Sequence, residues 1–535
     1  MIRVTDIVLP LDCREADFLP AVRKATGIKG ISSVKIAKRS VDARQKNNIR
    51  FLFSFDITVE GDEEKAMASS KYPHVSLTRD DRFLPVPCGV RTPRSVVVGA
   101  GPAGMMAAWA LAKAGMRPVV FERGADVRRR KADVEKFWQT GALDVRSNVQ
   151  FGEGGAGAFS DGKLTTGIKK DAYVRTLLDV FVGAGAPPEI LWQAKPHVGT
   201  DNLYRVVQNI RAEIIKAGGE YRFDSRVTDV VVKNGVLKGM VVETPDGIDE
   251  ITADAAVFAV GHSARDTFEM LQAKGVAMAP KAFAVGVRIE HPQALINASL
   301  YGRKTPPFPL GAADYKLAIH LPDGRSAYTF CMCPGGYVVA AASETGRVVT
   351  NGMSYFKRDG MNANSAFLVG VTPADFGGDD VLAGVRFQRD METAAFNAGG
   401  RTYAAPAQRV EDFLKGSETT AFGDVLPTYR PAPVPADLTA CLPAFVAKTL
   451  RAALPLAERK LKGFCFPDAV MTGVETRSSS PVRLLRDDKT MESLNVAGLY
   501  PCGEGAGYAG GIVSAGVDGL KCAERIIDEK IVLNG

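Results

Sequence analysis

The stretch Ser95-Val-Val-Val-Gly-Ala-Gly-Pro-Ala-Gly104 decides the fold of this chain. Its β-branched run predicts a strand that ends in a Gly-x-Gly-x-x-Gly turn, and the small residues of 103–114 predict a helix. A second apolar run at 118–121 ends on Glu122. In such a unit the glycines allow a tight turn, the approach of a pyrophosphate and close helix packing. The pattern predicts an adenine dinucleotide site with Glu122 on the ribose, and leaves NAD and FAD open.

Composition bounds the class of protein. The 535 residues are 46% hydrophobic and 24% charged, which is typical of a folded chain of about two to four domains. We expect no membrane span and no signal peptide. The eight cysteines are scattered apart from Cys331-Met-Cys333, so a reducing, cytoplasmic location is expected. The formal net charge of +7 is compatible with an anionic substrate and does not require nucleic acid.

Residues 1–90 predict a small basic α+β domain. Nine basic residues between Arg23 and Arg50 stand against Asp42 alone. Because no aromatic-rich recognition motif accompanies them, a solvated face, or one against the chain's own dinucleotide domain, is favoured over an RNA or acidic-partner surface. The stretch Pro85–Pro93 predicts a linker.

The C-terminal stretch 499–514, Leu-Tyr-Pro-Cys-Gly-Glu-Gly-Ala-Gly-Tyr-Ala-Gly-Gly-Ile-Val-Ser, separates FAD from NAD. An acid follows a strand there, and glycines lead into a helix. This arrangement resembles the last FAD motif of the glutathione-reductase-like flavoprotein superfamily. The resemblance implies that Glu504 binds the ribityl chain. It also implies that Gly511, Ile512 and Val513 present backbone N–H groups to the flavin edge.

Three further segments fit the same superfamily. Ala256–Gly261 resembles its second glycine-ended strand, and Val227 lies where relatives pair backbone groups with adenine. Gln150–Leu164 occupies the place of a glycine-rich loop along the pyrophosphate and isoalloxazine. Four segments in one order indicate FAD more strongly than any one of them.

A closer resemblance rests on Phe159–Leu164, Gly261–Asp266, Cys331–Gly336 and Gly473–Pro481. These segments resemble the family called FAD-dependent or NAD-utilizing dehydrogenases, whose members carry a small N-terminal domain before the FAD fingerprint. The substrate of that family is undefined. The resemblance therefore implies the fold and the cofactor over nearly the whole chain, but not the reaction.

The fold class expected is α/β, with a discontinuous Rossmann-like FAD-binding domain. Its first part spans 91–283 and its C-terminal part spans 481–535. Between them, 284–480 mixes strands with helices, which predicts an inserted mixed α+β substrate or cap domain. The small N-terminal domain precedes both.

Non-covalent FAD is expected to contact a set of mostly small residues and acids. They are Gly99, Gly101, Pro102, Ala103, Gly104, Glu122, Arg123, Gly155, Ser160, Asp161, Gly162, Lys163, Val227, Gly261, Gly503, Glu504, Gly511, Ile512 and Val513. Lys163 is predicted to contact the cofactor rather than form a salt bridge with Asp161 or Glu153. No metal site is predicted.

The electron donor is left open by the sequence. No second dinucleotide fingerprint follows a strand, and no Cys-x-x-x-x-Cys pair follows the first one. Reduction is therefore expected from the substrate, from transiently bound NAD(P)H, or from a protein partner.

Candidate catalytic groups are Glu475, Arg477 and His262. Arg477 suits a carboxylate substrate and Glu475 a proton transfer, although an interdomain ion pair explains them equally well. His262 is a candidate acid or base, against a loop histidine that bonds the backbone. Cys331 and Cys333 are predicted to be structural or pocket-lining rather than a redox pair or part of a metal site.

These patterns predict an oxidoreductase that transfers hydride between a small organic substrate and flavin N5. One alternative is an NAD(P)H-dependent flavin monooxygenase. The other is a non-catalytic flavoprotein whose N-terminal domain binds RNA or a protein. The substrate and the oligomeric state are not encoded in any motif.

Overall fold

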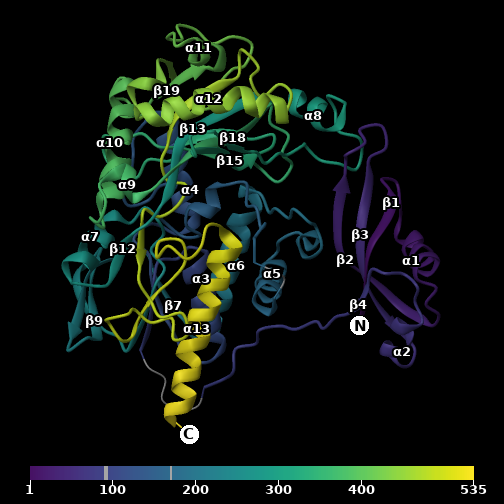
Figure 1. Ribbon diagram of the computed structural model, residues 1–535. Helices are drawn as coiled ribbons and strands as arrows, with labels where there is room; N and C mark the ends of the chain where they lie inside the picture. The colour runs from purple at the N-terminus through teal and green to yellow at the C-terminus, as the bar shows by residue number, and fades with distance from the viewer. Residues whose placement is uncertain (89–93, 169–170, 535) are drawn as a thin grey trace.

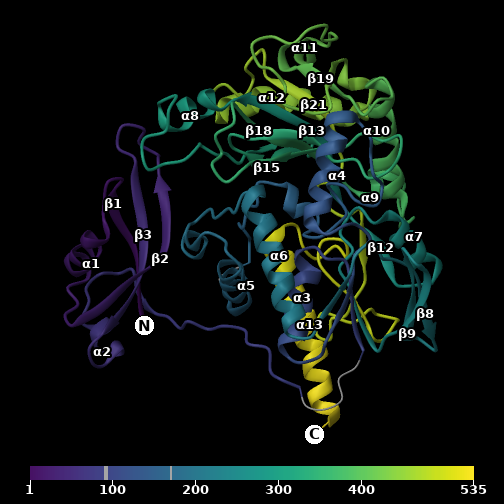
Figure 2. The ribbon, with the colours of Figure 1, turned by 180° about the vertical axis from the view of Figure 1, so that it is seen from behind.

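The computed structural model describes residues 1–88, 94–168 and 171–534. Two opposite views show a small N-terminal unit beside a lower part and an upper part (Figures 1 and 2). The predicted linker Pro85–Pro93 lies partly outside the described residues. Within those residues no helix has the length and apolar character that a membrane crossing needs.

The N-terminal unit is an antiparallel sheet with the order β2-β3-β1-β4. Its elements are β1 (Ile2–Pro10), α1 (Phe18–Thr26), β2 (Ile31–Asp42), β3 (Arg50–Val59), α2 (Glu63–Ala68) and β4 (Val75–Leu77). Alternate residues of β3, among them Phe53, Phe55 and Ile57, are buried. This period of two is what a sheet with one covered face requires.

Arg39 joins this sheet to the rest of the chain. Its N–H donates to the Trp192 carbonyl at 2.7 Å, and its carbonyl accepts from the Ala194 N–H at 2.9 Å. Its guanidinium lies over the rings of Phe51 and Trp192, 4.7 and 4.4 Å from their centroids. At this residue the basic stretch therefore faces the chain's own dinucleotide part.

The lower part is built on a parallel sheet with the order β23-β11-β5-β6-β7. The strands are β5 (Ser95–Val98), β6 (Val119–Phe121), β7 (Glu220–Arg222), β11 (Ala255–Phe258) and β23 (Leu499–Pro501). The chain runs outward from the central β5 on one side and returns through β11 on the other. In this doubly wound order, ligands bind at the carboxyl ends of the strands where the direction reverses.

Helices cover this sheet, and strands from 226–252 form a separate antiparallel sheet beside it. The helices are α3 (Pro102–Lys113), α4 (Val127–Thr140), α5 (Ala172–Gly183), α6 (Thr200–Lys216), α7 (Arg265–Ala273) and α13 (Ile512–Asn534). The antiparallel strands are β8 (Arg226–Lys233), β9 (Val236–Thr244) and β10 (Gly247–Thr252).

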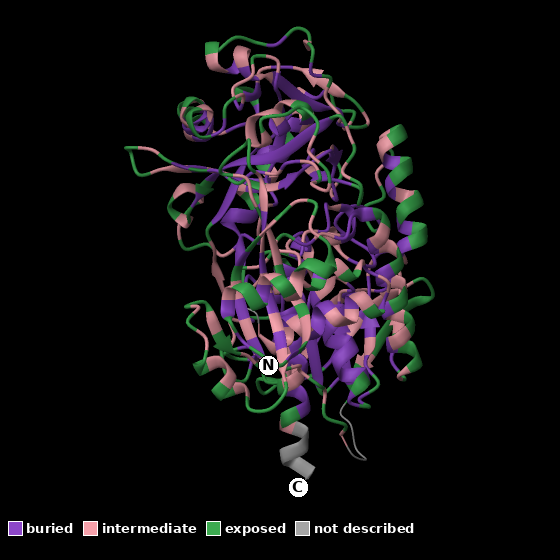
Figure 3. Ribbon diagram, turned by 90° about the vertical axis from the view of Figure 1, so that its right-hand side faces the viewer, coloured by how far each residue is buried: buried purple, intermediate pink, exposed green. Residues whose placement is uncertain are grey.

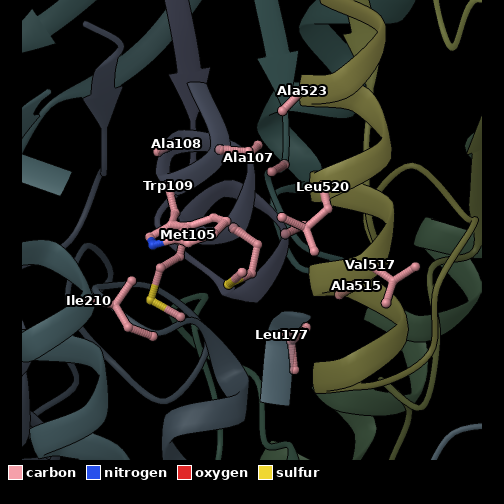
Figure 4. Close-up of a cluster of buried hydrophobic side chains, with 14 of the residues drawn as sticks. Met105, Ala107, Ala108, Trp109, Leu177, Ile210, Ala515, Val517, Leu520 and Ala523 are labelled. Atoms are coloured by element: carbon pink, nitrogen blue, oxygen red, sulfur yellow. The ribbon is translucent and has the colours of Figure 1, made fainter. Parts of the chain in front are cut away.

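The C-terminal helix α13 packs along α3. Figure 4 shows Met105 and Trp109 of α3 near Leu520 of α13, with Leu177 of α5 below them. A Cβ added to Gly519 would lie 2.0 Å from the Ala103 carbonyl oxygen, so only glycine allows this approach. The close contact holds the beginnings of both helices beside the carboxyl end of β5.

The upper part is built on a seven-stranded sheet with the order β14-β15-β18-β13-β21-β19-β20. Its strands are β13 (Phe283–Pro292), β14 (Ala318–His320), β15 (Ser326–Cys333), β18 (Asn362–Val371), β19 (Ala405–Arg409), β20 (Pro433–Pro435) and β21 (Val470–Glu475). The central strands β13 and β18 are buried almost throughout, and Figure 3 shows the sheet mostly in the colour of buried residues. Both faces of the sheet are therefore covered.

The remaining elements complete this part. They are α8 (Gln293–Tyr301), β16 (Tyr337–Ala340), β17 (Thr350–Met353), α9 (Pro373–Phe376), α10 (Ala383–Ala398), α11 (Val410–Lys415) and α12 (Ala444–Lys460). Strands β12 (Met278–Pro280) and β22 (Val482–Leu484) pair with each other where the chain enters and leaves the upper part.

Candidate functional site

A cavity of about 550 Å³ lies at the carboxyl ends of β5 and β11. The beginnings of α3 and α13, the loop 150–157 and residues of the upper sheet complete its wall. The residues from the sequence prediction that line it are Gly99, Gly101, Pro102, Ala103, Glu122, Arg123, Gly155, Ser160, Lys163, Val227, Gly261, His262, Glu475, Arg477, Glu504, Gly511 and Ile512. Segments far apart in the chain thus meet at one place.

Five other residues expected at the cofactor do not line this cavity: Gly104, Asp161, Gly162, Gly503 and Val513. Gly104 serves packing instead, because a Cβ there would lie 1.9 Å from the Gly99 carbonyl oxygen. Asp161 is fully buried, forms an ion pair with Arg358, and accepts the Ser354 hydroxyl at 2.6 Å. The Asp161 carboxylate therefore forms a structural ion pair and does not line the cavity, which corrects the prediction that this residue contacts the cofactor.

The glycine turn after β5 leaves the α3 N-terminus open to the cavity. Gly99 has a φ of +99°, and a Cβ there would lie 2.4 Å from the Ala259 carbonyl oxygen. A Cβ on Gly155 would lie 3.0 Å from the Gly101 Cα, so the two backbones nearly touch. No side chain caps α3. Its first N–H groups are therefore available to an anion.

Glu122 is buried and holds three backbone segments together. Its carboxylate accepts the N–H groups of Ala100 at 2.8 Å, Gly124 at 3.0 Å and Gly152 at 3.0 Å. A carboxylate has about four lone-pair sites, so capacity for one hydroxyl donor remains. The residue thus fixes the cavity wall and can also bind ribose.

Arg130 is a structural residue that sequence reasoning missed. It is fully buried on α4, and its guanidinium donates to the carbonyls of five residues in the loop below. They are Asn148 at 2.8 Å, Val149 at 2.9 Å, Gly152 at 3.1 Å, Glu153 at 2.7 Å and Gly155 at 2.9 Å. Burial lowers the pKa of Arg130 to about 10, so it stays charged at neutral pH. One side chain therefore shapes the glycine-rich loop.

The end of the cavity formed by Glu504 and the start of α13 lies beside the start of α3. Burial raises the pKa of Glu504 to about 7, although Lys281 opposes the shift. Among the residues the structure describes, none donates a hydrogen bond to its carboxylate. A Cβ added to Gly510 or Gly511 would meet no atom within 4 Å. This end therefore has free space, a free acceptor and a helix N-terminus.

Glu475 lies at the cavity wall with Arg288 behind it. Arg288 is fully buried, and its Nη1 donates to both Glu475 oxygens at 2.9 Å. Burial raises the pKa of Glu475 to about 7, and Arg288 opposes the shift. The carboxyl group can therefore exchange a proton near neutral pH. The ion pair between Glu475 and Arg288 lies within the upper part, so it is not the interdomain ion pair considered from the sequence.

Arg477 is engaged by a different acid. Its Nε and Nη2 donate to Glu392 at 3.1 and 3.0 Å, and Arg265 donates to the same carboxylate at 2.7 and 2.9 Å. Burial disfavours the Glu392 carboxylate, but the two arginines lower its pKa well below the usual value. The bidentate fork expected for a substrate carboxylate is thus already occupied, and Arg477 offers mainly charge.

His262 is neutral in this site. Its Nδ1 lies 3.0 Å from the Ser263 hydroxyl, which donates to the Gln150 Oε1 at 3.1 Å. Burial lowers the pKa of His262 to about 3, and the nearby Arg477 and Arg265 add to the shift. A neutral imidazole can donate or accept a hydrogen bond but is a weak base here.

Two lysines face the cavity without an acidic partner. Lys163 and Lys316 line it, and neither forms an ion pair with any residue in the described parts of the chain. The alternative salt bridges of Lys163 do not form, because Asp161 pairs with Arg358 and Glu153 with Arg211 at 3.3 Å.

Cys331 occupies an unusual position on the same wall. It lies at a bulge of β15, its φ is +41°, and its side chain lines the cavity. For a non-glycine residue a left-handed backbone costs roughly 1–3 kcal/mol and occurs disproportionately at functional sites.

Comparisons with known proteins define the class. An NAD(P)-binding Rossmann-like domain matches residues 97–137, and a description of FAD-dependent proteins, C-terminal domain-like, matches 282–478. A domain of unknown function matches 1–58. An uncharacterized protein of Clostridium beijerinckii is 49% identical over 99% of this chain and 99% of its own length. The chain belongs to the same family as this protein, a family of FAD-dependent proteins with a Rossmann-like dinucleotide-binding domain.

Solved structures are similar only at a distance. A geranylgeranyl bacteriochlorophyll reductase-like protein of Thermoplasma acidophilum is 14% identical, with 83% of this chain and 84% of that chain covered and a TM-score of 0.36. The glycerol-3-phosphate dehydrogenase of Bacillus halodurans, complexed with FAD, is 13% identical over 83% and 63%, with a TM-score of 0.31. Neither likeness bears on the reaction.

The cavity fits FAD in its donors, acceptors and free space. The uncapped start of α3 suits a pyrophosphate, and the carboxylates of Glu122 and Glu504 suit hydroxyl groups. Cβ atoms on Gly261 and Gly511 would meet nothing within 4 Å, so no protein atom blocks these positions.

Proposed function

We propose that the protein transfers hydride between an organic substrate and the N5 atom of non-covalently bound FAD. One observation carries this proposal: the uncapped start of α3, the acceptors Glu122 and Glu504, and the start of α13 line one cavity, opposite Glu475 of the upper sheet. When bound, FAD supplies the hydride-accepting ring, and the protein supplies orientation and electrostatics.

The cofactor would be held by the parts 91–283 and 481–535, in the doubly wound arrangement of the glutathione-reductase-like superfamily. Val227 would pair with adenine and Glu122 with the ribose. Glu504 would bind the ribityl chain, and the N–H groups at the start of α13 would face the flavin edge. The substrate would lie against 284–480.

The substrate side would combine a proton-exchanging carboxyl with cations. Glu475 can take or give a proton near neutral pH, and Arg288 fixes its orientation. Lys163 and Lys316 would hold an anionic group of the substrate. Arg477 adds positive charge, and neutral His262 offers a hydrogen bond. Transient NAD(P)H or a protein partner would serve as the second redox partner.

The test begins with the full chain purified with FAD. We expect a flavin spectrum that survives gel filtration, and anaerobic bleaching by one class of a metabolite panel that includes NADH and NADPH. E475Q should keep the flavin spectrum and slow the bleaching. K316A should raise KM for an anionic substrate, whereas K357A, at an exposed lysine outside the cavity, should not. Protein that retains no FAD would contradict the proposal.

A further inference from the structure

Two thiols stand next to each other where the upper sheet meets the cavity. Cys331 lines the cavity, and Cys333, two residues on, is fully buried behind it. Both cysteines are free thiols, and the Cys333 thiol donates a hydrogen bond to the Cys331 carbonyl oxygen at 3.3 Å. The proposed hydride transfer uses neither of them.

The bulge in β15 brings the two residues closer than a regular strand would. Phe330 pairs with Ala366 and Cys333 with Asn364, so three residues of β15 oppose two of β18. A regular strand rises about 3.3 Å per residue, so positions i and i+2 lie about 6.6 Å apart, near the upper limit that a disulfide spans. The bulge fits three residues of β15 into the length of two residues of β18, and Cys331 has a positive φ. Cys331 and Cys333 are therefore closer together than residues i and i+2 of a regular strand.

The charges around the pair favour a reactive sulfur at Cys331. The neighbouring Cys333 thiol and the positive charges of Lys163 and Arg288 lower the pKa of Cys331, whereas burial and Asp161 oppose this. The pKa of Cys333 is raised by burial. Arg288 also donates to the Cys331 carbonyl at 2.5 Å and to the Cys333 sulfur at 3.5 Å, which fixes both residues. The thiolate therefore forms on the sulfur that faces the cavity.

We infer that Cys331 and Cys333 form a redox-active dithiol that exchanges two electrons with FAD bound in this cavity. In the oxidising direction both S–H bonds break and one S–S bond forms. The electron pair and one proton pass to FAD, and the second proton passes to the Glu475 carboxylate. The reverse step reduces the disulfide. The inference rests on the proposed function only in that FAD is bound; it does not depend on the organic substrate.

A redox-active dithiol at this place indicates the chemical class of the compound that exchanges electrons with the flavin besides the organic substrate. A dithiol at the cavity wall can exchange with an external thiol or disulfide through Cys331, which is the partly exposed sulfur of the two. The partner that restores the flavin would then be a thiol or a disulfide compound.

An anaerobic dithionite titration of the air-oxidised, FAD-loaded full chain tests the inference. Flavin and disulfide are each two-electron couples, so wild type should take up about four electrons per FAD and C331S and C333S about two. C502S is the matched control, because Cys502 and Cys522 are a second pair of fully buried thiols, with sulfurs within 4.8 Å of each other, that does not line this cavity. It should still take up about four electrons per FAD. Uptake of two electrons by wild type, or loss of the extra pair in C502S alone, overturns the inference.

A second readout does not need the cofactor. One tryptic peptide, residues 326–347, contains Cys331 and Cys333 and no other cysteine. After diamide treatment of FAD-free protein and alkylation, this peptide should lose two hydrogen atoms and resist alkylation until dithiothreitol is added. Full alkylation after oxidation would overturn the inference. If no organic substrate bleaches the flavin but the extra electrons remain, the proposed hydride transfer fails and the dithiol stands.

Discussion

Replacing Arg130 should unfold the glycine-rich loop of the cavity more than any surface change on the same helix. Of the five carbonyls that its guanidinium binds, Gly152 and Gly155 also accept other N–H groups, from Gly155 and Ala158. Those of Asn148, Val149 and Glu153 have no second donor among the residues that the structure describes. R130M would leave these three buried acceptors unsatisfied.

The expected cost follows from that count. An unsatisfied buried polar group costs about 1–3 kcal/mol, and water entering the loop relieves part of it. R130M should therefore lower the free energy of unfolding by about 3–5 kcal/mol, and R130K, which keeps the charge and reaches fewer carbonyls, by about half as much. FAD affinity should fall with the same ranking, because the loop forms one wall of the cavity.

Urea unfolding of the FAD-free protein and a fluorescence titration with FAD measure the two effects. R129M is the matched control, since Arg129 is the preceding residue, is half-exposed and pairs with Asp224 at the surface. It should change stability by less than about 1 kcal/mol. An R130M protein that unfolds within about 1 kcal/mol of R129M would refute the role given to this guanidinium.

Three further changes have expected outcomes. G104A should abolish FAD retention and lower the melting temperature, because its Cβ meets a carbonyl oxygen at 1.9 Å, whereas G183A, with no atom within 4 Å, should be neutral or slightly stabilising. Folded Glu504, whose pKa is raised to about 7 from 4.5, binds its proton more tightly than the unfolded chain, so stability falls as the pH rises from about 4.5 to 7. E504Q should reduce this fall by about 1–2 kcal/mol in urea titrations at several pH values, and an unchanged slope would contradict the assignment. R39A should speed hydrogen exchange at 192–194, and R44A, whose partner Asp42 lies two residues earlier at the end of β2, should not.

The parts of the site that the sequence could predict are those that one short stretch determines by itself. The turn of 95–104 needs a positive φ at Gly99 and close backbone contact at Gly104. Glycine meets both requirements, so the two positions are recognisable in the sequence by their spacing. Glu122 and Glu504 were predictable for the same reason, because Glu122 directly follows β6 and Glu504 is the third residue after the end of β23 in the parallel sheet. The end of a strand fixes the positions of the few residues that follow it, whatever the rest of the chain does.

Arg130 could have been found from a signal that was present. Val127, Arg130, Val134 and Phe137 are the buried positions of α4, with the spacing of one helix face. An arginine on an apolar face must have buried acceptors for its charge. Arg130 was not singled out because it stands in a run of four basic residues, 128–131, of which the other three are on the solvent side of the helix.

The partners of the candidate catalytic groups could not be predicted in this way. Glu475 is paired by Arg288, 187 positions earlier, and Arg477 by Glu392, 85 positions earlier. Each pair depends on which strands and helices become neighbours in the upper part, and no local pattern encodes that. The adjacent acid and arginine therefore looked like one functional unit, although they belong to two separate ion pairs.

The charges left over after these pairings bear on the substrate. Glu475 is balanced by Arg288 and Arg123 by Asp266 at 3.0 Å, whereas Arg477 shares the Glu392 carboxylate with Arg265. Among the described residues of the cavity wall, Lys163, Lys316, Glu122 and Glu504 form no ion pair, and the Glu122 carboxylate is held by three backbone N–H groups. FAD would bring its own negative charge to the start of α3, on the other side of the cavity from the upper sheet. A neutral substrate would leave two cations facing an apolar or weakly polar ligand, which is unfavourable, so we expect the substrate to carry negative charge.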